Sequence, residues 1–256
     1  MPHFFVSSKD IKGNEVLITG GEAKHIVTVL RKREGDKIDI FDGYGNEFKV
    51  RILEIDRHAG LPRVKAEIIT EKRRETEPKL RITLFQAIPK GNRLEFIIQK
   101  STEIGISEIV PIITERTIVR LDHKKIKQRT LRWQKIAREA AKQSRRSAIP
   151  RVGPVLDFSQ ALKEFSARKP HTGIIAWEME EKNRLRETLK SSVGGGTSKL
   201  PLAIFIGPEG GFTAEEVEEA RKKGLVPVSL GSRILRTETA GLVVAIAALY
   251  ESGDIG

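Results

Sequence analysis

About two thirds of the chain, from residue 80 to the C-terminus, alternates short apolar runs with longer segments of helical period. Runs such as LRITLFQAI, ISEIVPIIT, TGIIAWE and PLAIFIG have the length and composition of buried strands. The segments between them carry helix signals; LEFIIQKSTEIG, for example, ends at Gly105, and Asp157 is a plausible N-cap for the helix that follows it. This alternation predicts an α/β domain with a mainly parallel sheet.

The first seventy residues have a different pattern. EVLITG, DKIDIFDG, EFKVRILEID and RVKAEIITE alternate apolar and polar side chains with a period of two, and one helical stretch, EAKHIVTVLRK, interrupts them. We interpret this region as a small β-barrel crossed by a helix. The charged segment EKRRETEPK (71–79) reads as a linker, so the predicted domains are 1–72 and 73–256. Within the second, we expect a long helix from Lys124 to Ser147 and a flexible loop at GGGTSK (194–199).

A glycine-rich segment follows the apolar run AIFI (203–206). The sequence Gly-Pro-Glu-Gly-Gly leads at once into a predicted helix, for which Thr213 and Glu216 have capping-box spacing. A strand, a glycine-rich turn and a helix usually suggest phosphate binding. Here no Lys-Ser/Thr pair follows the glycines, and Glu209, Glu215 and Glu216 would repel a phosphate. A flat, hydrogen-bonding ligand without phosphate, such as S-adenosyl-methionine (SAM), fits better.

A second glycine-containing loop follows the next predicted strand. VPVSL is expected to end at Leu230, and Gly231 to Arg236 lead into an apolar helix capped by Thr237 or Thr239. Because this helix is apolar nearly all round, we expect it to be buried, either within the fold or at a dimer seam. The glycines of one loop could simply serve tight turns. Two such loops at consecutive strand ends favour a ligand site, since open α/β sheets bind ligands there.

Charge and cysteine content restrict the partners. The net charge is +12, and the segment from Arg116 to Arg151 holds 13 Lys or Arg against 2 acids, nearly the whole excess. Such a block indicates either a polyanion such as RNA or a solvated basic helix. The chain has no cysteine, its histidines lack metal-ligand spacing, and no apolar run is long enough to span a bilayer. We therefore expect no metal, no membrane association and a cytoplasmic location.

At this point the motifs resemble a known family. IGPEGGF followed by LGSRILRTETA is similar to the signature of the RsmE family of 16S rRNA uridine-N3 methyltransferases, in the SPOUT superfamily. MPHFFV, HIVTVLRKREGDKIDIFDG, QAIPKGNRLEFIIQKSTEIGISEIVPIITERT and RWQKIAREAAKQSRRSAIPRV resemble other family blocks, in order, over almost the whole chain.

The resemblance implies a PUA-like N-terminal barrel, a C-terminal SPOUT α/β domain with a deep trefoil knot, SAM as methyl donor, 16S rRNA in the small ribosomal subunit as substrate, and a homodimer. In this reading the cofactor-binding candidates are Glu178, Ile206, Gly207, Pro208, Gly210, Leu230, Gly231, Ile234, Leu235 and Thr239. The RNA-binding candidates are Arg31, Lys90, Arg93, Lys100, Arg138, Gln143, Arg145 and Arg146.

Methylation of uridine N3 requires loss of the N3 proton. We hypothesise that Arg236 stabilises the anionic uracil and that Glu209 or Glu238 accepts the proton or orients the base. Arg236 could instead form a salt bridge to Glu238 or cap the helix, and Glu178 could be an ordinary surface acid. Two other functions remain open: an RNA-binding protein that does not bind SAM, and a SPOUT methyltransferase that acts on another RNA such as tRNA.

Overall fold

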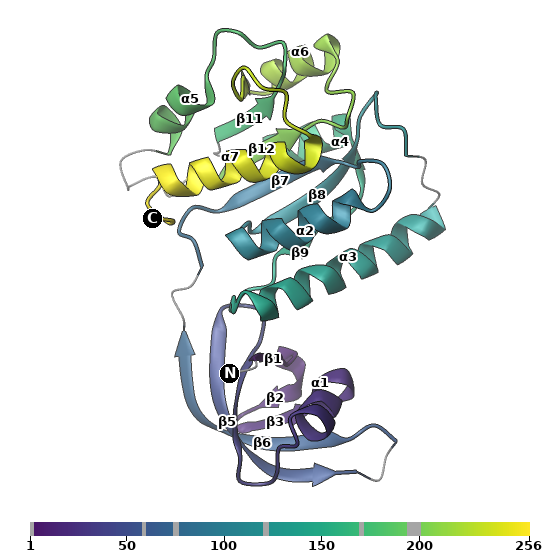
Figure 1. Cartoon of the computed structure of the whole chain (residues 1–256), viewed down its shortest axis with the longest axis vertical. Coiled ribbons are helices and arrows are strands. Elements are labelled where there is room, and N and C mark those ends of the chain that lie inside the picture. The colour runs from purple at the N-terminus through teal and green to yellow at the C-terminus, as the bar shows by residue number, and fades with distance from the viewer. Residues whose placement is uncertain (1–2, 58–59, 74–76, 120–122, 169–171, 194–200) are drawn as a thin grey trace. The chain divides into compact units, whose positions relative to one another are not determined.

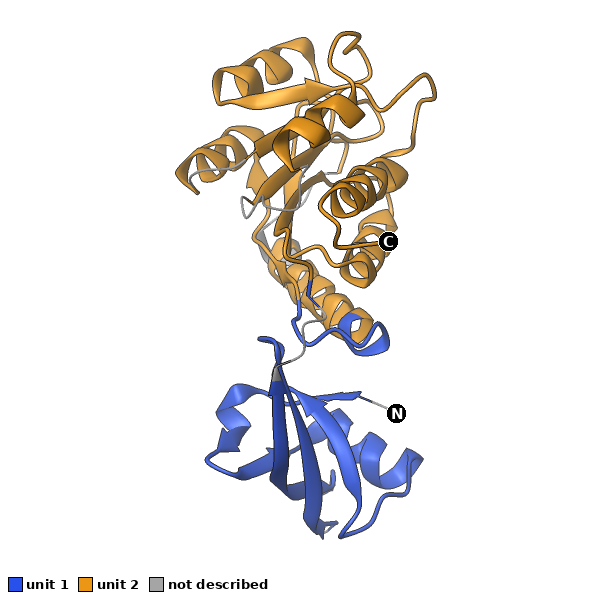
Figure 2. Cartoon of the chain, turned by 90° about the vertical axis from the view of Figure 1, so that its left-hand side faces the viewer, with its two compact units in different colours: residues 1–77, 141–149 blue, residues 78–140, 150–256 orange. Residues whose placement is uncertain are grey.

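The computed structural model describes residues 3–57, 60–73, 77–119, 123–168, 172–193 and 201–256, without the side chains of residues 73 and 123–125. The predicted loop 194–199 and part of the linker, residues 74–76, lie outside these ranges. The chain forms two compact units (Figure 2): unit 1 comprises residues 1–77 and 141–149, and unit 2 comprises residues 78–140 and 150–256. Segment 141–149, which the sequence places in the second domain, therefore belongs to unit 1.

Unit 1 is built on a six-stranded sheet in the order β1-β4-β5-β6-β3-β2. Strand β1 runs parallel to β4, and the other pairs are antiparallel. Apolar residues that alternate along the strands form its core, among them Phe4, Ile18, Val50 and Val64. The strands are β1 (His3–Phe5), β2 (Ile11–Lys12), β3 (Glu15–Ile18), β4 (Lys37–Phe41), β5 (Asn46–Asp56) and β6 (Arg63–Arg73), and helix α1 (Gly20–Lys24) continues into a π-helical turn (His25–Val29).

Unit 2 has a seven-stranded sheet in which every pair is parallel. The order is β10-β8-β7-β12-β11-β13, with β9 also paired to β8. The strands are β7 (Ile82–Ala87), β8 (Glu108–Ile113), β9 (Arg151–Val152), β10 (Leu156–Asp157), β11 (Thr172–Ala176), β12 (Leu202–Ile206) and β13 (Leu225–Val228). The prediction of an α/β domain with a parallel sheet is confirmed.

Helices cover both faces of this sheet (Figure 1). Helices α2 and α7 contact each other on one face, with α5 against α7, whereas α4 and α6 pack on the other face. Their bounds are α2 (Arg93–Ile104), α3 (His123–Gln143), α4 (Phe158–Ala167), α5 (Leu185–Ser192), α6 (Ala214–Lys222) and α7 (Thr237–Glu251). None of the helices in the described ranges combines the length and the apolar content that a membrane span requires.

Stacked aromatic rings form the core beneath α4. Phe85 and Phe205 are register partners on β7 and β12, and their rings stack at 4.3 Å. Phe158 and Phe165 of α4 meet the Phe205 ring edge-on. The approach of α4 requires a glycine on β11, because a Cβ on Gly173 would lie 2.5 Å from the Phe165 ring. The apolar runs that the sequence predicts to be buried strands are thus packed against helices on both faces of the sheet.

Local sequence signals place most helix ends. Gly105 takes a left-handed conformation (φ 107°) after α2, as expected for a C′ glycine. Asp157 and Gln160 form a complete capping box at the start of α4. Helix α3 ends at Gln143, earlier than the predicted Ser147, because Arg145 adopts a positive φ of 56° and the Arg146 N–H bonds back to the Ala141 carbonyl.

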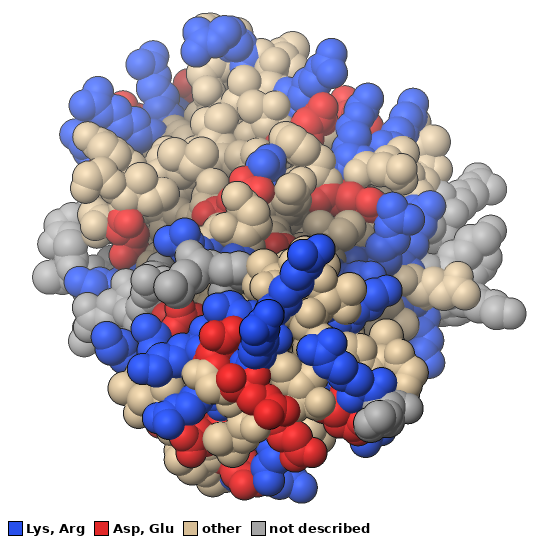
Figure 3. Space-filling model, turned by 60° about the horizontal axis from the view of Figure 1, so that its bottom comes forward, with Lys and Arg blue, Asp and Glu red and all other residues tan. Residues whose placement is uncertain are grey.

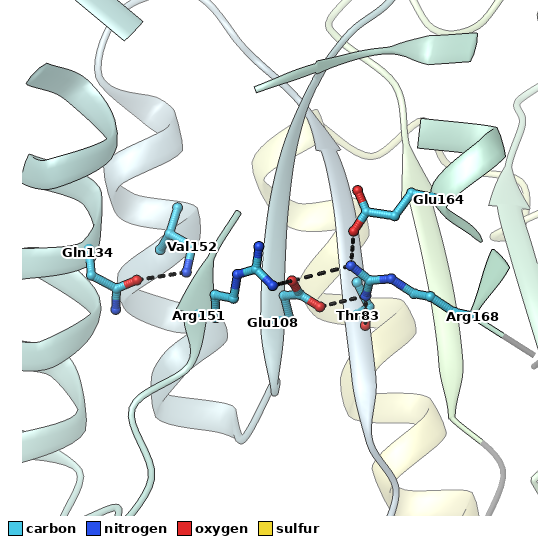
Figure 4. A network of polar contacts seen from close by, with 7 residues as sticks. All are labelled: Thr83, Glu108, Gln134, Arg151, Val152, Glu164 and Arg168. Atoms are coloured by element: carbon cyan, nitrogen blue, oxygen red, sulfur yellow. Dashed lines mark hydrogen bonds and ion pairs between the residues drawn. The ribbon is translucent and has the colours of Figure 1, made fainter. Parts of the chain in front are cut away.

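A charged network ties the amino ends of the sheet to α4 (Figure 4). Arg168 is the C-cap residue of α4. Its guanidinium donates to Glu108 at 2.5 Å and to the Thr83 hydroxyl at 3.3 Å, and it also pairs with Glu164. Burial alone would lower the pKa of Arg168, but Glu108 and then Glu164 outweigh it and raise the pKa. Arg151 reaches Glu108 only at 3.7 Å from an exposed position.

Replacement of Arg168 by Met should lower the free energy of unfolding by about 1–3 kcal/mol, because the mostly buried Glu108 carboxylate loses its principal partner. Arg151→Met is the matched control and should change it by less than about 1 kcal/mol, since that pair is exposed. Urea titration measures both values. Equal losses in the two variants would show that Arg168 has no special structural role.

Candidate functional site

The strand order brings three connecting loops together at the carboxyl edge of the sheet. Strands β12, β11 and β13 are neighbours, and each ends at this edge. The segments that follow them, 176–186, 206–212 and 229–240, line one cavity of about 1090 Å³, and Arg93 of α2 adds to its wall. Ligand pockets of this kind are commonly about 300–1,000 Å³, and open α/β sheets form them at this edge.

Most of the residues chosen from the sequence as cofactor ligands lie in this cavity. Those that line it are Glu178, Ile206, Gly207, Pro208, Leu230, Gly231, Ile234 and Leu235. Two do not: Gly210 is exposed and contacts the Arg116 side chain, whose guanidinium donates to the Gly210 carbonyl at 2.7 Å, and Thr239 lies on the exposed side of α7. The three catalytic candidates, Glu209, Arg236 and Glu238, all line the cavity.

The glycine-rich loop after β12 is closely packed. A Cβ on Gly207 would lie 3.1 Å from the backbone of Gly211, and Gly211 itself has a φ of 69°. Thr213 and Glu216 form the predicted capping box of α6, and Glu216 also accepts the Glu115 N–H. The Thr213 hydroxyl accepts the Glu216 N–H and the Glu216 carboxylate accepts the Thr213 N–H, so the start of α6 is capped by its own side chains, and the preceding loop lines the cavity.

Glu209 is held from outside the loop. Its Oε1 accepts the Arg93 guanidinium at 2.8 Å and the Lys90 backbone N–H at 3.0 Å. These contacts fasten the glycine-rich loop to the connection between β7 and α2. Because the same carboxylate oxygen is already engaged by two donors of the neighbouring connection, this geometry favours a positioning role for Glu209.

The loop between β13 and α7 supplies the opposite wall. Gly231 has a φ of 108°, and Ile234 is 86% exposed although it is apolar. Arg236 is the N-cap of α7; its side chain is 79% exposed and approaches Glu238 at only 3.9 Å. Glu238 is mostly covered, and its Oε2 is buried without a hydrogen-bond partner among the described residues. The start of α7 therefore carries both a buried carboxylate oxygen, from Glu238, and an exposed guanidinium, from Arg236.

Thr237 does not cap α7 as the sequence suggests, and neither does Thr239. Thr237 is instead the first residue of α7 and is buried, and its hydroxyl donates to the Gly207 carbonyl at 2.6 Å. The same hydroxyl accepts from the buried amide of Gln86, at the end of β7, at 3.0 Å. Thr237 therefore joins the ends of two strands to the start of α7, and Gln86 is a site residue that sequence reasoning missed.

Glu180 anchors the third loop and was also missed. It is 5% exposed and accepts the backbone N–H groups of Lys182 and Asn183 as well as the Arg221 guanidinium at 2.8 Å. Burial would raise the pKa of Glu180, but the Asn183 and Lys182 N–H groups and the Arg221 charge together lower it. An acid two and three residues before backbone donors was the available signal, in the run EMEEKN.

The cavity wall has no dominant charge. Five glutamates and five arginines line it, of which Glu180 and Glu209 are already paired. Such a wall suits a zwitterionic or mixed ligand better than a polyphosphate. Among the described residues, no group of three or more His, Asp or Glu side chains could hold a metal ion.

Comparison with known proteins identifies the family. A model of the RNA methyltransferase domain matches residues 76–249, and a model of the RNA methyltransferase PUA domain matches residues 18–60. Ribosomal RNA small subunit methyltransferase E of Bacillus subtilis is 37% identical over 235 residues, which cover 92% of this chain and 90% of that protein. The chain belongs to the ribosomal RNA small subunit methyltransferase E family. The resemblance drawn from its motifs is thereby confirmed, as is a PUA-like N-terminal region.

Solved structures of relatives agree with the fold. A family member from Neisseria gonorrhoeae bound to S-adenosyl methionine is 33% identical, has a TM-score of 0.78 and covers 98% of this chain and 97% of its own. A methyltransferase from Legionella pneumophila in complex with bound SAM is 30% identical, has a TM-score of 0.82 and covers 98% of this chain and 97% of its own.

The RNA-binding candidates of this family member are divided between the units. In unit 2, Arg93 holds Glu209, Lys100 pairs with Glu103, and Arg138 lies beside Glu139; Lys90 is also in this unit. Unit 1 contains Arg31, Gln143, Arg145 and Arg146. Arg146 is 5% exposed and bound to Glu77 at 2.5 Å, which indicates a structural role.

The basic segment is less positive in the fold than in the sequence. Arg132 pairs with Glu95, Lys142 with Glu22, and Arg146 with Glu77, so acids from distant segments neutralise part of it. In the view of Figure 3, Lys and Arg side chains are spread across the face, and Asp and Glu side chains lie among them. Fewer cations of this segment are therefore free to meet a polyanion than its sequence suggests.

Replacement of Thr237 by Val should destabilise the protein by about 1–3 kcal/mol, because the buried Gly207 carbonyl and Gln86 amide lose their shared partner without a change of shape. Thr237→Ser should restore most of the loss. Thr239→Val, on the exposed side of the same helix turn, is the control. Chemical denaturation decides the matter: a neutral T237V variant would mean that the hydroxyl does not hold α7 to the sheet.

Replacement of Glu180 by Gln should lower the melting temperature at neutral pH by a few degrees. Because the pKa of Glu180 in the folded protein lies below its ordinary value of 4.5, the wild-type carboxylate contributes stability above that pH and loses it as the pH falls through the folded pKa. The difference between variant and wild type should therefore shrink on acidification. Glu181→Gln, an exposed neighbour, should show no such trend; a pH-independent difference for E180Q would contradict the argument.

Proposed function

We propose that this chain transfers the methyl group of SAM to N3 of a uridine in 16S rRNA of the small ribosomal subunit. The observation that carries the proposal is the single cavity formed by the loops GPEGG and LGSRILRTETA at neighbouring strand ends. Family membership supplies the substrate class, and the SAM-bound relatives support the methyl donor.

The residues of the cavity fit SAM. Ile234 offers an exposed apolar surface for a flat ring, and the mixed glutamate and arginine wall suits a ligand with a sulfonium, an ammonium and a carboxylate. The Glu238 Oε2 is a covered acceptor without a partner among the described residues. We propose backbone contacts at Ile206, Gly207, Pro208, Leu230, Gly231, Ile234 and Leu235, with Glu178 beside the first loop. Gly210 and Thr239 are weaker candidates because neither lines the cavity.

When bound, SAM supplies an electrophilic methyl group. The protein has three tasks: to hold uridine N3 in line with that methyl, to accept the N3 proton, and to stabilise the anionic uracil. Positioning can contribute about 7–11 kcal/mol, and a general base about a hundred- to ten-thousand-fold in rate. We assign the charge stabilisation to Arg236, which projects from the loop, and the proton to Glu238. Glu209 positions the loop.

The target base must leave its stack to reach such a cavity. Among the RNA-binding candidates, Lys90 and Arg93 lie next to the glycine-rich loop and are proposed to contact RNA near the reacting uridine. Arg31, Arg138, Lys100, Gln143 and Arg145 remain proposals as contacts farther along the RNA. A ribosomal substrate also favours a cytoplasmic location.

A trefoil knot and a homodimer complete the proposal. The chain leaves β13 at one edge of the sheet and returns to α7, which packs against β12 and β7; this return supports a knot in which the loop 229–236 is confined. On helix α7, which the sequence predicts to be buried within the fold or at a dimer seam, Ile246 is 44% and Tyr250 68% exposed in the single chain. An apolar face of this kind supports pairing with a second copy.

The proposal is tested by mass mapping of 16S rRNA after incubation with the protein and SAM. One uridine should gain a methyl group at N3. A product in tRNA and not in 16S rRNA would favour the alternative of a related methyltransferase with another substrate. Absence of SAM binding in isothermal titration would instead favour a protein that only binds RNA.

Replacement of Arg236 by Ala should lower kcat by about 10²–10³-fold, because a cation placed at a developing anion acts mainly in the transition state. SAM affinity should change far less. Lys222→Ala, which removes an exposed cation of α6 outside the cavity lining, should leave kcat within a few-fold of wild type. Equal losses of turnover and SAM affinity in R236A would assign Arg236 to cofactor binding or to the fold.

A further inference from the structure

The turn between β4 and β5 in unit 1 presents an aromatic ring to solvent. Tyr44 is 77% exposed, and it lies between Gly43 and Gly45, which have φ values of 81° and 105°. A single exposed aromatic residue is common and carries little meaning by itself. What distinguishes Tyr44 is how firmly its backbone is held.

Hydrogen bonds fix this turn from inside and from a distant segment. The carboxylate of Asp42, 5% exposed, accepts the Tyr44 N–H at 2.7 Å and both the backbone and side-chain N–H groups of Asn46. The Gly43 carbonyl accepts the Ile149 N–H at 3.0 Å, and the Gly45 N–H donates to the Ser147 carbonyl at 3.1 Å. The ring of Tyr44 is thus displayed on a preorganised backbone, which lowers the entropic cost of binding to it.

The segment that supports this turn also contains a strained arginine. Arg145 follows α3 with a φ of 56°, and the Arg146 N–H bonds to the Ala141 carbonyl in a Schellman arrangement. This position normally holds Gly, because side chains are disfavoured there. Arg145 is exposed, and it lies two residues, at most about 7 Å of chain, from the Ser147 that bonds to Gly45.

A second exposed arginine of unit 1 also follows a helical turn with a positive φ. Arg31 follows the π-helical turn with a φ of 52°, and the Lys32 N–H bonds to the Ile26 carbonyl at 3.1 Å. Neighbouring cations of this unit are engaged, Lys142 by Glu22 and Arg146 by Glu77. Strain that is retained at two exposed arginines suggests that their side chains serve binding and not stability.

We propose that Tyr44 is a stacking platform for an unpaired base of the RNA, and that Arg145 binds a phosphate next to that base. This inference rests on the proposed function for RNA as substrate and adds that unit 1 recognises single-stranded RNA. An exposed ring provides a face for any base, and a guanidinium provides charge for the backbone. Duplex RNA, whose bases are stacked on each other, has no free face to offer.

The test for Tyr44 compares a short single-stranded oligouridylate with a fully paired RNA duplex. Tyr44→Ala should weaken binding of the single strand by about fivefold to a hundredfold, and Tyr44→Phe and Tyr44→Trp should retain it, because they keep an aromatic face. Affinity for the duplex should be unchanged. Equal loss on both RNAs, or loss in the Phe and Trp variants, would overturn stacking.

The test for Arg145 uses a variant that should raise the stability of the protein while it lowers the affinity for RNA. Arg145→Gly should raise the melting temperature, because Gly relieves the positive φ, and yet weaken RNA binding. The slope of log affinity against log salt should also fall by about one. A variant that is more stable and binds RNA with wild-type affinity and salt slope would overturn the phosphate contact.

Two further outcomes separate this inference from its foundations. Wild-type protein that binds the single strand through Tyr44 but methylates no RNA would refute the proposed function and leave the platform intact. Methylation of 16S rRNA that is insensitive to Tyr44→Ala, with unchanged oligouridylate binding, would refute the platform alone. If Tyr44→Ala weakened binding only to the assembled subunit, the ring would contact a ribosomal protein, contrary to the inference.

Discussion

The buried hydroxyl of Thr237 connects the parts of unit 2 on which the cavity depends. It donates to Gly207 at the end of β12 and accepts from Gln86 at the end of β7. Four residues later, Gly241 allows α7 to pack closely on the sheet, because a Cβ at this position would lie only 3.3 Å from the side chains of Gln86 and Leu84. With the start of α7 fixed over β7 and β12, the loop from β13 must cross the carboxyl edge, where it closes the cavity against the glycine-rich loop.

Local signals in the sequence predict most helices and strands, but they do not predict contacts between residues that are distant in the sequence. Gly105, Asp157 and Thr213 mark helix ends through backbone preferences of a few neighbouring residues. Thr237 was misread because a Thr before an apolar helix usually caps it, whereas its real partners lie 30 and 151 residues away. The strand order that unites the three loops is likewise a property of the packed sheet. The two glycine-containing loops could be assigned to one site only through the rule for open α/β sheets.

The charge pattern shows the same limit. A segment with 13 basic residues and 2 acids predicted a broad polyanion surface. Folding places Glu22, Glu77 and Glu95 against that segment, so several of its cations hold the structure together. The cations that the fold leaves exposed in strained backbone, such as Arg145, could not be distinguished from their neighbours by sequence alone. Fewer of these cations are therefore available to a polyanion than the sequence alone suggests.

The central claim is that the three loops at the carboxyl ends of β11, β12 and β13 bind SAM as one site. Hydrogen–deuterium exchange with and without SAM tests it most directly. We expect protection in residues 176–186, 206–212 and 229–240 together, and no change in unit 1. Protection confined to one loop, or its absence at saturating SAM, would contradict the account.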